Sequence, residues 1–167
     1  MSDLWKKTLI FDDDATEAIR FITRDISQGA VPKATEHTLF ETNISCMMFA
    51  ALYGVLNNER RVMEKPTSKG AKIDYQQLIP YETKLNFVLQ TVLLMHNEEN
   101  ETNEDKLDRA FRYPDKHFNL FLEYVCGGLK KLREECDDLD ENSSSTYFTI
   151  VKQLIDDSEE DYDIVLV

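Results

Sequence analysis

The chain has 167 residues, of which 42% are apolar, 31% charged and 10% aromatic, and its formal net charge is −13. These values exclude a collagen-like or globally disordered chain. So acidic a surface also repels nucleic acids and anionic membranes, except where basic residues are concentrated.

The length predicts one domain, which we place at residues 1–157, followed by an acidic and then apolar tail at 158–167. No apolar run is long enough to span a membrane, and the first residues do not resemble a signal peptide. The three cysteines show no CxxC spacing and cannot form a closed disulfide set. We therefore expect a cytoplasmic protein without a membrane contact.

In the first half of the chain, residues 4–11 predict a short strand or extended arm. Asp12–Asp14 follow and are suited to capping a helix over about 14–28. The next helix, 38–57, is apolar nearly all round and should be the central core helix. A polar loop follows at 59–76, with a short extended piece at 71–75.

In the second half, apolar spacing predicts helices at 81–96 and 116–136, the latter with Asp115 as its N-cap. A charged spacer and a short helix lie between them, and an amphipathic helix is expected at 146–154. The fold class is therefore mostly α: a compact domain of about five helices, with a short N-terminal strand or arm and an acidic C-terminal extension. Gly127 and Gly128 predict close packing of the fourth long helix against another helix.

Catalytic signals are missing from the sequence. His37, His96 and His117 lie in different predicted elements, without the spacing of metal ligands. No glycine-rich phosphate loop is present, and Cys126 is best interpreted as a small packed residue. We expect no catalytic residue, no cofactor and no metal, and hence no enzyme.

Two charged segments are candidate binding sites. The loop 59–72 concentrates basic residues that could contact phosphates or an acidic partner, or else neutralise the protein's own acidic tail: Arg60, Arg61, Lys65, Lys69 and Lys72. In 134–163, 12 acidic residues accompany one lysine. This segment is either a solubilising extension or a site that docks on a basic partner or mimics DNA, through Glu134, Glu135, Asp137, Asp138, Asp156, Asp157, Glu159, Glu160 and Asp161.

A third pattern has the order of a ribbon-helix-helix unit: a strand at 6–11 followed by helices near 14–28 and 38–57. Dimers of such units read DNA with a two-stranded ribbon. The aspartates at 12–14 would repel phosphates beside that ribbon, so this interpretation is a minor alternative.

Two segments carry a family resemblance. Residues 40–54, FETNISCMMFAALYG, resemble the F-x-T…F-A-A-x-x-G helix of the small Dnd-system-associated proteins, which are encoded beside bacterial DNA phosphorothioation and restriction genes. Residues 121–132, FLEYVCGGLKKL, resemble the E-Y-x-x-G-G-L-x-x-L segment of the same family. The resemblance covers about 36–157.

The resemblance implies a mostly helical, non-enzymatic accessory subunit of an anti-phage defence or DNA modification-restriction system. Its partner would be a larger protein, such as an ATPase, a nuclease or a modification enzyme. The alternative is a nucleic-acid-directed protein that binds DNA through 59–72 or mimics it through 134–163. A homo-oligomeric scaffold is a third option.

Overall fold

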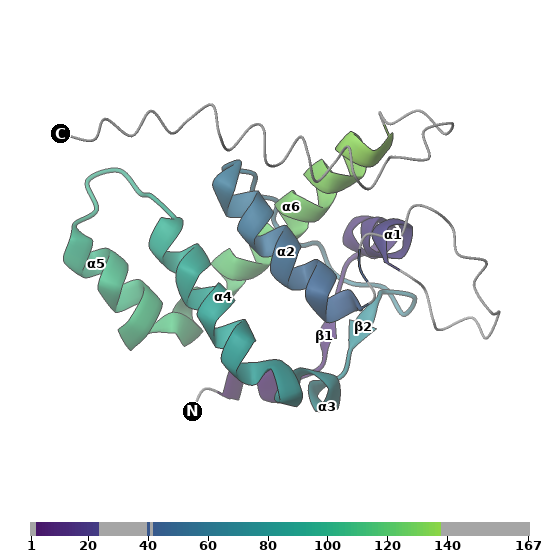
Figure 1. Ribbon diagram of the computed structural model, residues 1–167, viewed down its shortest axis with the longest axis horizontal. Helices are drawn as coiled ribbons and strands as arrows, with labels where there is room; N and C mark the ends of the chain where they lie inside the picture. Colours follow the sequence, from purple (N-terminus) through teal and green to yellow (C-terminus); the bar gives the residue numbers. More distant parts are fainter. Residues whose placement is uncertain (1–2, 24–39, 41, 138–167) are drawn as a thin grey trace, which may run out of the picture.

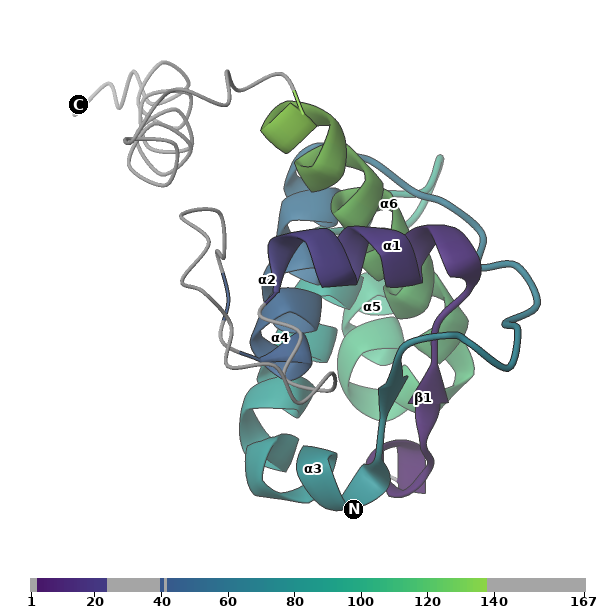
Figure 2. The same ribbon diagram turned by 90° about the vertical axis from the view of Figure 1, so that its right-hand side faces the viewer.

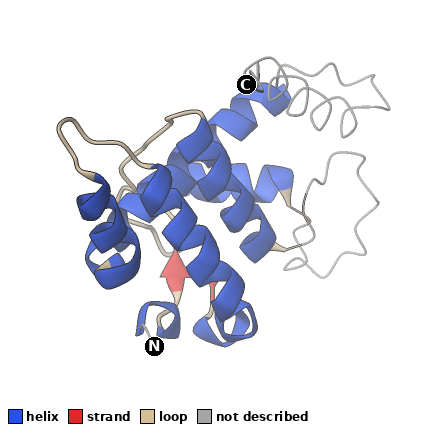
Figure 3. Ribbon diagram, turned by 60° about the vertical axis from the view of Figure 1, so that its left-hand side comes forward, coloured by secondary structure: helices blue, strands red, loops and turns tan. Residues whose placement is uncertain are grey.

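The computed structural model describes residues 3–23, 40 and 42–137. The part of the chain that it describes is mostly α-helical, with one small two-stranded sheet, as the sequence predicted (Figure 1 and Figure 3). The α-helices are α1 (Asp13–Ile22), α2 (Asn43–Leu56), α3 (Tyr75–Leu78), α4 (Glu82–Met95), α5 (Asn103–Leu107) and α6 (Phe118–Asp137). The 3₁₀ turns are η1 (Asp3–Lys6), η3 (Ile79–Tyr81) and η5 (Pro114–His117), and η4 (Asp108–Arg112) is a π-helical turn.

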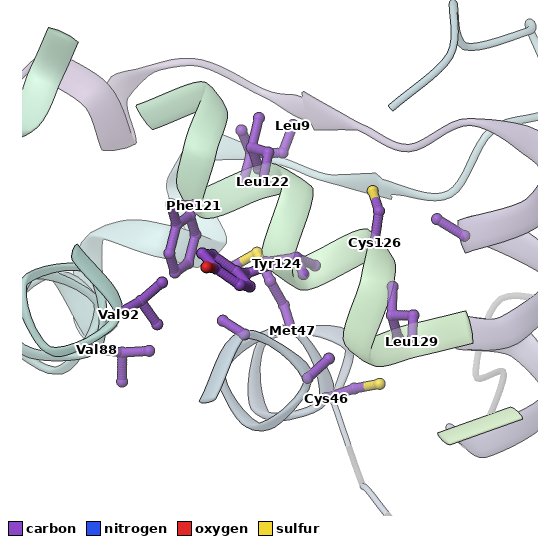
Figure 4. Packing of buried hydrophobic residues seen from close by; sticks show 14 of the residues in the cluster. Leu9, Cys46, Met47, Val88, Val92, Phe121, Leu122, Tyr124, Cys126 and Leu129 are labelled. Carbon is purple, nitrogen blue, oxygen red and sulfur yellow. The ribbon is translucent and has the colours of Figure 1, made fainter. Parts of the chain in front are cut away.

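Helix α2 lies at the centre, packed against α4 on one side and α6 on the other (Figure 1). It contains no charged residue over its 14 positions, which suits a helix with several covered faces. Figure 4 shows Phe121 and Tyr124 of α6 beside Val92 of α4 and Met47 of α2, all of them buried. The central core helix that the sequence predicted is therefore α2.

Where α2 and α6 cross, the backbones of the two helices are in direct contact. A Cβ atom added at Gly128 would lie 1.9 Å from the carbonyl oxygen of Ala50, and one added at Gly54 would lie 2.2 Å from that of Tyr124. Gly127 faces the carbonyl of Glu59 in the same way, at 2.1 Å. No side chain fits at these positions, so glycine is what permits the close helix approach.

The sheet pairs the N-terminal segment with the loop that follows α2. Strands β1 (Leu9–Ile10) and β2 (Lys72–Ile73) are antiparallel, with Leu9 opposite Ile73 (Figure 2). The strand of 6–11 is thus only two residues long, and it pairs within the chain. The ribbon-helix-helix interpretation is therefore wrong, because that architecture needs this strand to pair with a second copy.

The N-terminal turn is anchored through Trp5, which is 1% exposed and donates a hydrogen bond from its indole nitrogen to Asn86 at 2.6 Å. Its ring meets those of Phe118 and Phe121 edge-on. Figure 2 shows α1 lying across α2 and α6, so that this segment and α1 cover two sides of the same core.

Several predicted boundaries shift. Asp12 caps α1 as expected, but α2 begins at Asn43 instead of 38 because the Thr42 hydroxyl accepts from the Ser45 amide. Asp115 was predicted as a helix N-cap and instead lies inside η5, which begins at Pro114 and leads into α6. The predicted helix 146–154 and the tail 158–167 lie outside the described residues.

Candidate interaction surface

The two arginines of the basic loop point into the protein's own carboxylates. Arg60 donates from two nitrogens to Glu123, at 2.5 and 3.1 Å, and its guanidinium lies over the ring of Tyr124. Arg61 forms a two-point pair with Asp12, at 2.7 and 2.8 Å, and its backbone amide donates to the carbonyl of Glu123. The arginines thus fasten the start of the loop to α6 and to the N-terminus of α1.

Asp12 is the hub of this attachment and is 2% exposed. Burial acts to raise the pKa of Asp12, but hydrogen bonds from Arg61 and from the amides of Ala15 and Glu64 outweigh burial and hold the pKa below its ordinary value. One carboxylate therefore caps α1, holds the loop and neutralises Arg61. This internal pairing leaves Arg61 poorly placed for an outside phosphate.

The three lysines of the loop behave differently. Lys65, Lys69 and Lys72 are exposed, and no carboxylate among the described residues lies within ion-pair distance of their ammonium groups. The backbone between them is held by Arg20, which donates to the carbonyl of Lys69. The structure thus divides the predicted basic site into two structural arginines and three solvent-facing lysines.

The described acidic candidates on α6 pair within their own helix. Glu134 lies 3.8 Å from the ammonium of Lys130, and Glu135 lies 3.5 Å from that of Lys131. Glu135 also accepts a hydrogen bond from the Tyr53 hydroxyl at 2.5 Å, which ties α6 to α2. Asp137 is the last residue of α6, and the other predicted acidic contacts lie outside the described residues: Asp138, Asp156, Asp157, Glu159, Glu160 and Asp161.

One surface feature was not predicted from the sequence. Side chains of α2 and α4 line an open apolar groove of about 690 Å³. We call it the α2/α4 groove, and it is lined by Phe40, Ser45, Met48, Phe49, Leu52, Thr83, Lys84, Phe87 and Val88. Phe87 is 68% exposed, and the half-buried ring of Phe49 stacks against the buried ring of Tyr53. The all-round apolar character of α2 was the available signal, but it did not show which face the other described residues leave open.

A buried polar network closes the C-terminal end of α4. His96 is 4% exposed, with Nδ1 2.7 Å from the Tyr124 hydroxyl and Nε2 3.0 Å from Glu98. Arg109 donates to the carbonyls of Leu93 and His96 and pairs with the carboxylate of Glu101. The hydrogen bond to His96 lowers the pKa of Glu98. The charged spacer after α4 is therefore held in place by a histidine and an arginine that sequence reasoning left unassigned.

The cysteine thiols are packed within the core. Cys46 and Cys126 are both buried, and burial raises the pKa of Cys126 to about 12. A thiol with so high a pKa is almost entirely protonated at neutral pH and is a poor nucleophile. Within the described residues, no group of three or more histidine, cysteine, aspartate or glutamate side chains could hold a metal ion.

Together the fold and its surfaces define a small, acidic, mostly helical protein with an apolar groove that the described residues leave open between α2 and α4. In the described part of the chain, no helix combines the length and the apolar character needed to cross a membrane. The family model for DNA sulphur modification system-associated protein 4 matches residues 23–166, and the chain belongs to that family.

The resemblance predicted from residues 40–54 and 121–132 is thus confirmed, and the matched region extends beyond the predicted 36–157 at both ends. No curated protein and no solved structure was found to match the chain. Association with a DNA sulphur modification system follows from the family.

Proposed function

We propose that the protein is a non-enzymatic accessory subunit that binds a larger protein of the DNA sulphur modification system. The α2/α4 groove carries this proposal, because its lining is mostly apolar and leaves Phe87 68% exposed, so that apolar side chains of a partner would remove this surface from water. Family membership supports the cellular context. An ATPase, a nuclease or a modification enzyme of the system is the expected partner class, with a role in anti-phage defence.

Three of the nucleophile and base candidates, His96, Cys46 and Cys126, support a non-catalytic role. Both ring nitrogens of His96 are engaged by Tyr124 and Glu98 within the protein, and Cys46 and Cys126 are buried. General acid–base chemistry needs a side chain within hydrogen-bond reach of a bound substrate. None of these three side chains is offered to an outside molecule in that way.

Co-expression of the tagged full chain with its gene neighbours tests the proposal. Size-exclusion chromatography with light scattering should give a mass larger than the 19.5 kDa chain or its small multiples, with a second protein identified by mass spectrometry. Recovery of the chain alone, as a monomer or homo-oligomer, would argue against an accessory subunit.

A second candidate, direct DNA contact, is favoured by the three exposed lysines of 59–72. DNA binding through these lysines should weaken steeply as the salt concentration rises. In the triple charge reversal of Lys65, Lys69 and Lys72, the slope of log K against log salt concentration should become shallower by about 3. A flat salt response in a fluorescence-anisotropy titration with duplex DNA rejects this candidate. DNA mimicry by 134–163 predicts instead that truncation after residue 133 abolishes inhibition of a DNA-binding protein.

A further inference from the structure

We propose that the exposed lysines of the loop 59–72 bind an acidic run of the same chain, residues 156–163, and that this contact limits the access of outside anions to the loop. We call Lys65, Lys69 and Lys72 the loop lysines, and the acidic run has the sequence DDSEEDYD. The contact would form whether or not the protein is an accessory subunit. It makes an outside anion, DNA or an acidic protein, compete with the chain's own carboxylates for the same ammonium groups.

The backbone that carries the loop lysines is held by the rest of the fold. The Glu64 amide donates to the buried carboxylate of Asp12 at 2.8 Å, and Arg20 donates to the carbonyl of Lys69 at 3.0 Å. Lys72 lies in β2, which pairs with β1 (Figure 2). Each loop lysine is therefore at or beside a residue whose backbone is fixed, and an anion that binds there does not have to order the loop first.

The described residues leave the loop lysines without an anionic partner. No carboxylate among them lies within ion-pair distance of these three ammonium groups. On α6, by contrast, Lys130 and Lys131 each pair with a glutamate one turn away, and Arg60 pairs with Glu123. In a chain with a net charge of −13, three such cations within residues 65–72 form a local site that attracts carboxylates.

Charge identifies the acidic run as the occupant among the segments outside the described residues. Residues 24–39 contain two acidic and two basic residues, and residues 138–141, directly after α6, contain three acidic ones. The acidic run has six carboxylates in eight residues and no basic residue. Carboxylates form charge-assisted hydrogen bonds with ammonium groups, so the segment with the densest carboxylates gains most at the loop lysines.

The connecting chain is long enough for this contact. The 18 residues 138–155 separate the end of α6 from the acidic run and reach at most about 60 Å when extended. The radius of gyration of a domain of this size is only about 14 Å. Because both groups belong to one chain, their contact has an effective concentration that a free anion must exceed in order to compete.

Zero-length crosslinking of the natural full chain tests the contact directly. A water-soluble carbodiimide joins an amine to a carboxylate that touches it. Peptide mass mapping should find links from the loop lysines to the acidic run at about 0.01 M salt. The links should disappear at about 1 M salt, because the Debye length falls from about 30 to about 3 Å. Lys84 of α4 is the matched control, since it is also exposed and has no ion-pair partner among the described residues.

A mixture of ¹⁵N-labelled and unlabelled chains separates links within one chain from links between two copies. The same labelled chain gives a second measurement in solution. When the six carboxylates of the acidic run are replaced by their amides, Asp→Asn and Glu→Gln, the amide NMR shifts of residues 65–72 should change. Those around Lys84 should not, whereas a change in the overall field of the protein would move both.

A binding assay measures the effect on outside anions. The amide variant should bind a fluorescein-labelled polyglutamate peptide about tenfold more tightly than the natural chain does in fluorescence anisotropy. Replacing the loop lysines by glutamine in the amide variant should abolish this gain. Far-UV circular dichroism should show that the variants keep the helical content of the natural chain, and the crosslinking experiment needs no substitution at all.

The outcomes separate this contact from the accessory role. Links that join the loop lysines to another segment or to a second copy overturn the inference, as do links to Lys84 that are equally frequent. Unchanged NMR shifts at residues 65–72, or equal affinity of the natural chain and the amide variant for polyglutamate, overturn it as well. None of these results bears on the accessory role, which the co-expression experiment decides.

Discussion

Replacing Gly128 by alanine tests the main-chain crossing of α2 and α6. The new Cβ would lie 1.9 Å from the Ala50 carbonyl oxygen, and ordinary van der Waals contact begins at 3.4 Å. The two helices must therefore part locally by about 1.5 Å, and the neighbouring atoms are backbone that cannot turn aside. Forcing atoms into a packed core costs about 3–4 kcal/mol under these conditions, while alanine returns about 1 kcal/mol of helix propensity. We expect a net loss of about 2–3 kcal/mol.

Urea unfolding followed by far-UV circular dichroism measures this loss, and the single tryptophan, Trp5, is a second probe because it is buried in the core. For a chain of this size the melting temperature should fall by about 4–12 °C. A Gly128→Ala variant that is more stable than the natural chain would refute the reasoning, since an unobstructed helix position gains stability from alanine.

A double-mutant cycle with Gly54→Ala sharpens the test. Its Cβ would lie 2.2 Å from the Tyr124 carbonyl oxygen at the same crossing, so either substitution forces the same separation. The double variant should lose clearly less stability than the two single losses together. Simple additivity would show that the two glycines relieve independent clashes.

Three further predictions concern the buried charges and thiols. Asp12→Asn should destabilise the protein by about 2–3 kcal/mol at neutral pH. Because the folded pKa of Asp12 lies below its unfolded value of 3.8, the carboxylate contributes fully above that value and the difference should shrink as pH falls through the folded pKa, in urea titrations from pH 7 to pH 3. Arg61→Ala should destabilise the protein by a similar amount. In the same assay, replacing Lys65, Lys69 and Lys72 together by alanine should change stability by less than about 0.5 kcal/mol. Cys126 should resist alkylation by iodoacetamide until the protein unfolds, because burial raises its pKa to about 12, and peptide mass mapping that finds it modified in the native protein would contradict this.

The sequence was informative where the cause of structure is local. The apolar spacing of α4 and α6 and the all-apolar run of α2 identified the three core helices, and Asp12 was correctly expected to cap α1. The observed start of α2 differs from the predicted one because the Thr42 hydroxyl caps the N-terminus of the helix, and apolar periodicity does not locate such a cap.

Prediction was weaker wherever distant residues meet. Arg60 and Arg61 were grouped with the loop lysines by charge density, but their partners lie 63 and 49 residues away in sequence. Which basic side chains face solvent and which pair with the protein's own carboxylates depends on the tertiary structure. The α2/α4 groove is of the same kind, because an all-apolar helix does not reveal which of its faces the described residues leave open.

The contact of α2 with α6 through backbone atoms has a consequence for local motion. Packed helices can usually shift a little through changes of side-chain rotamer. This cannot happen where Gly54 and Gly128 contact the backbone of the facing helix directly. Opening this crossing means moving whole helices and exposing the residues around it. Amide hydrogens of α2 and α6 near the crossing should therefore exchange with solvent only when the entire core unfolds, and define its last-opening unit.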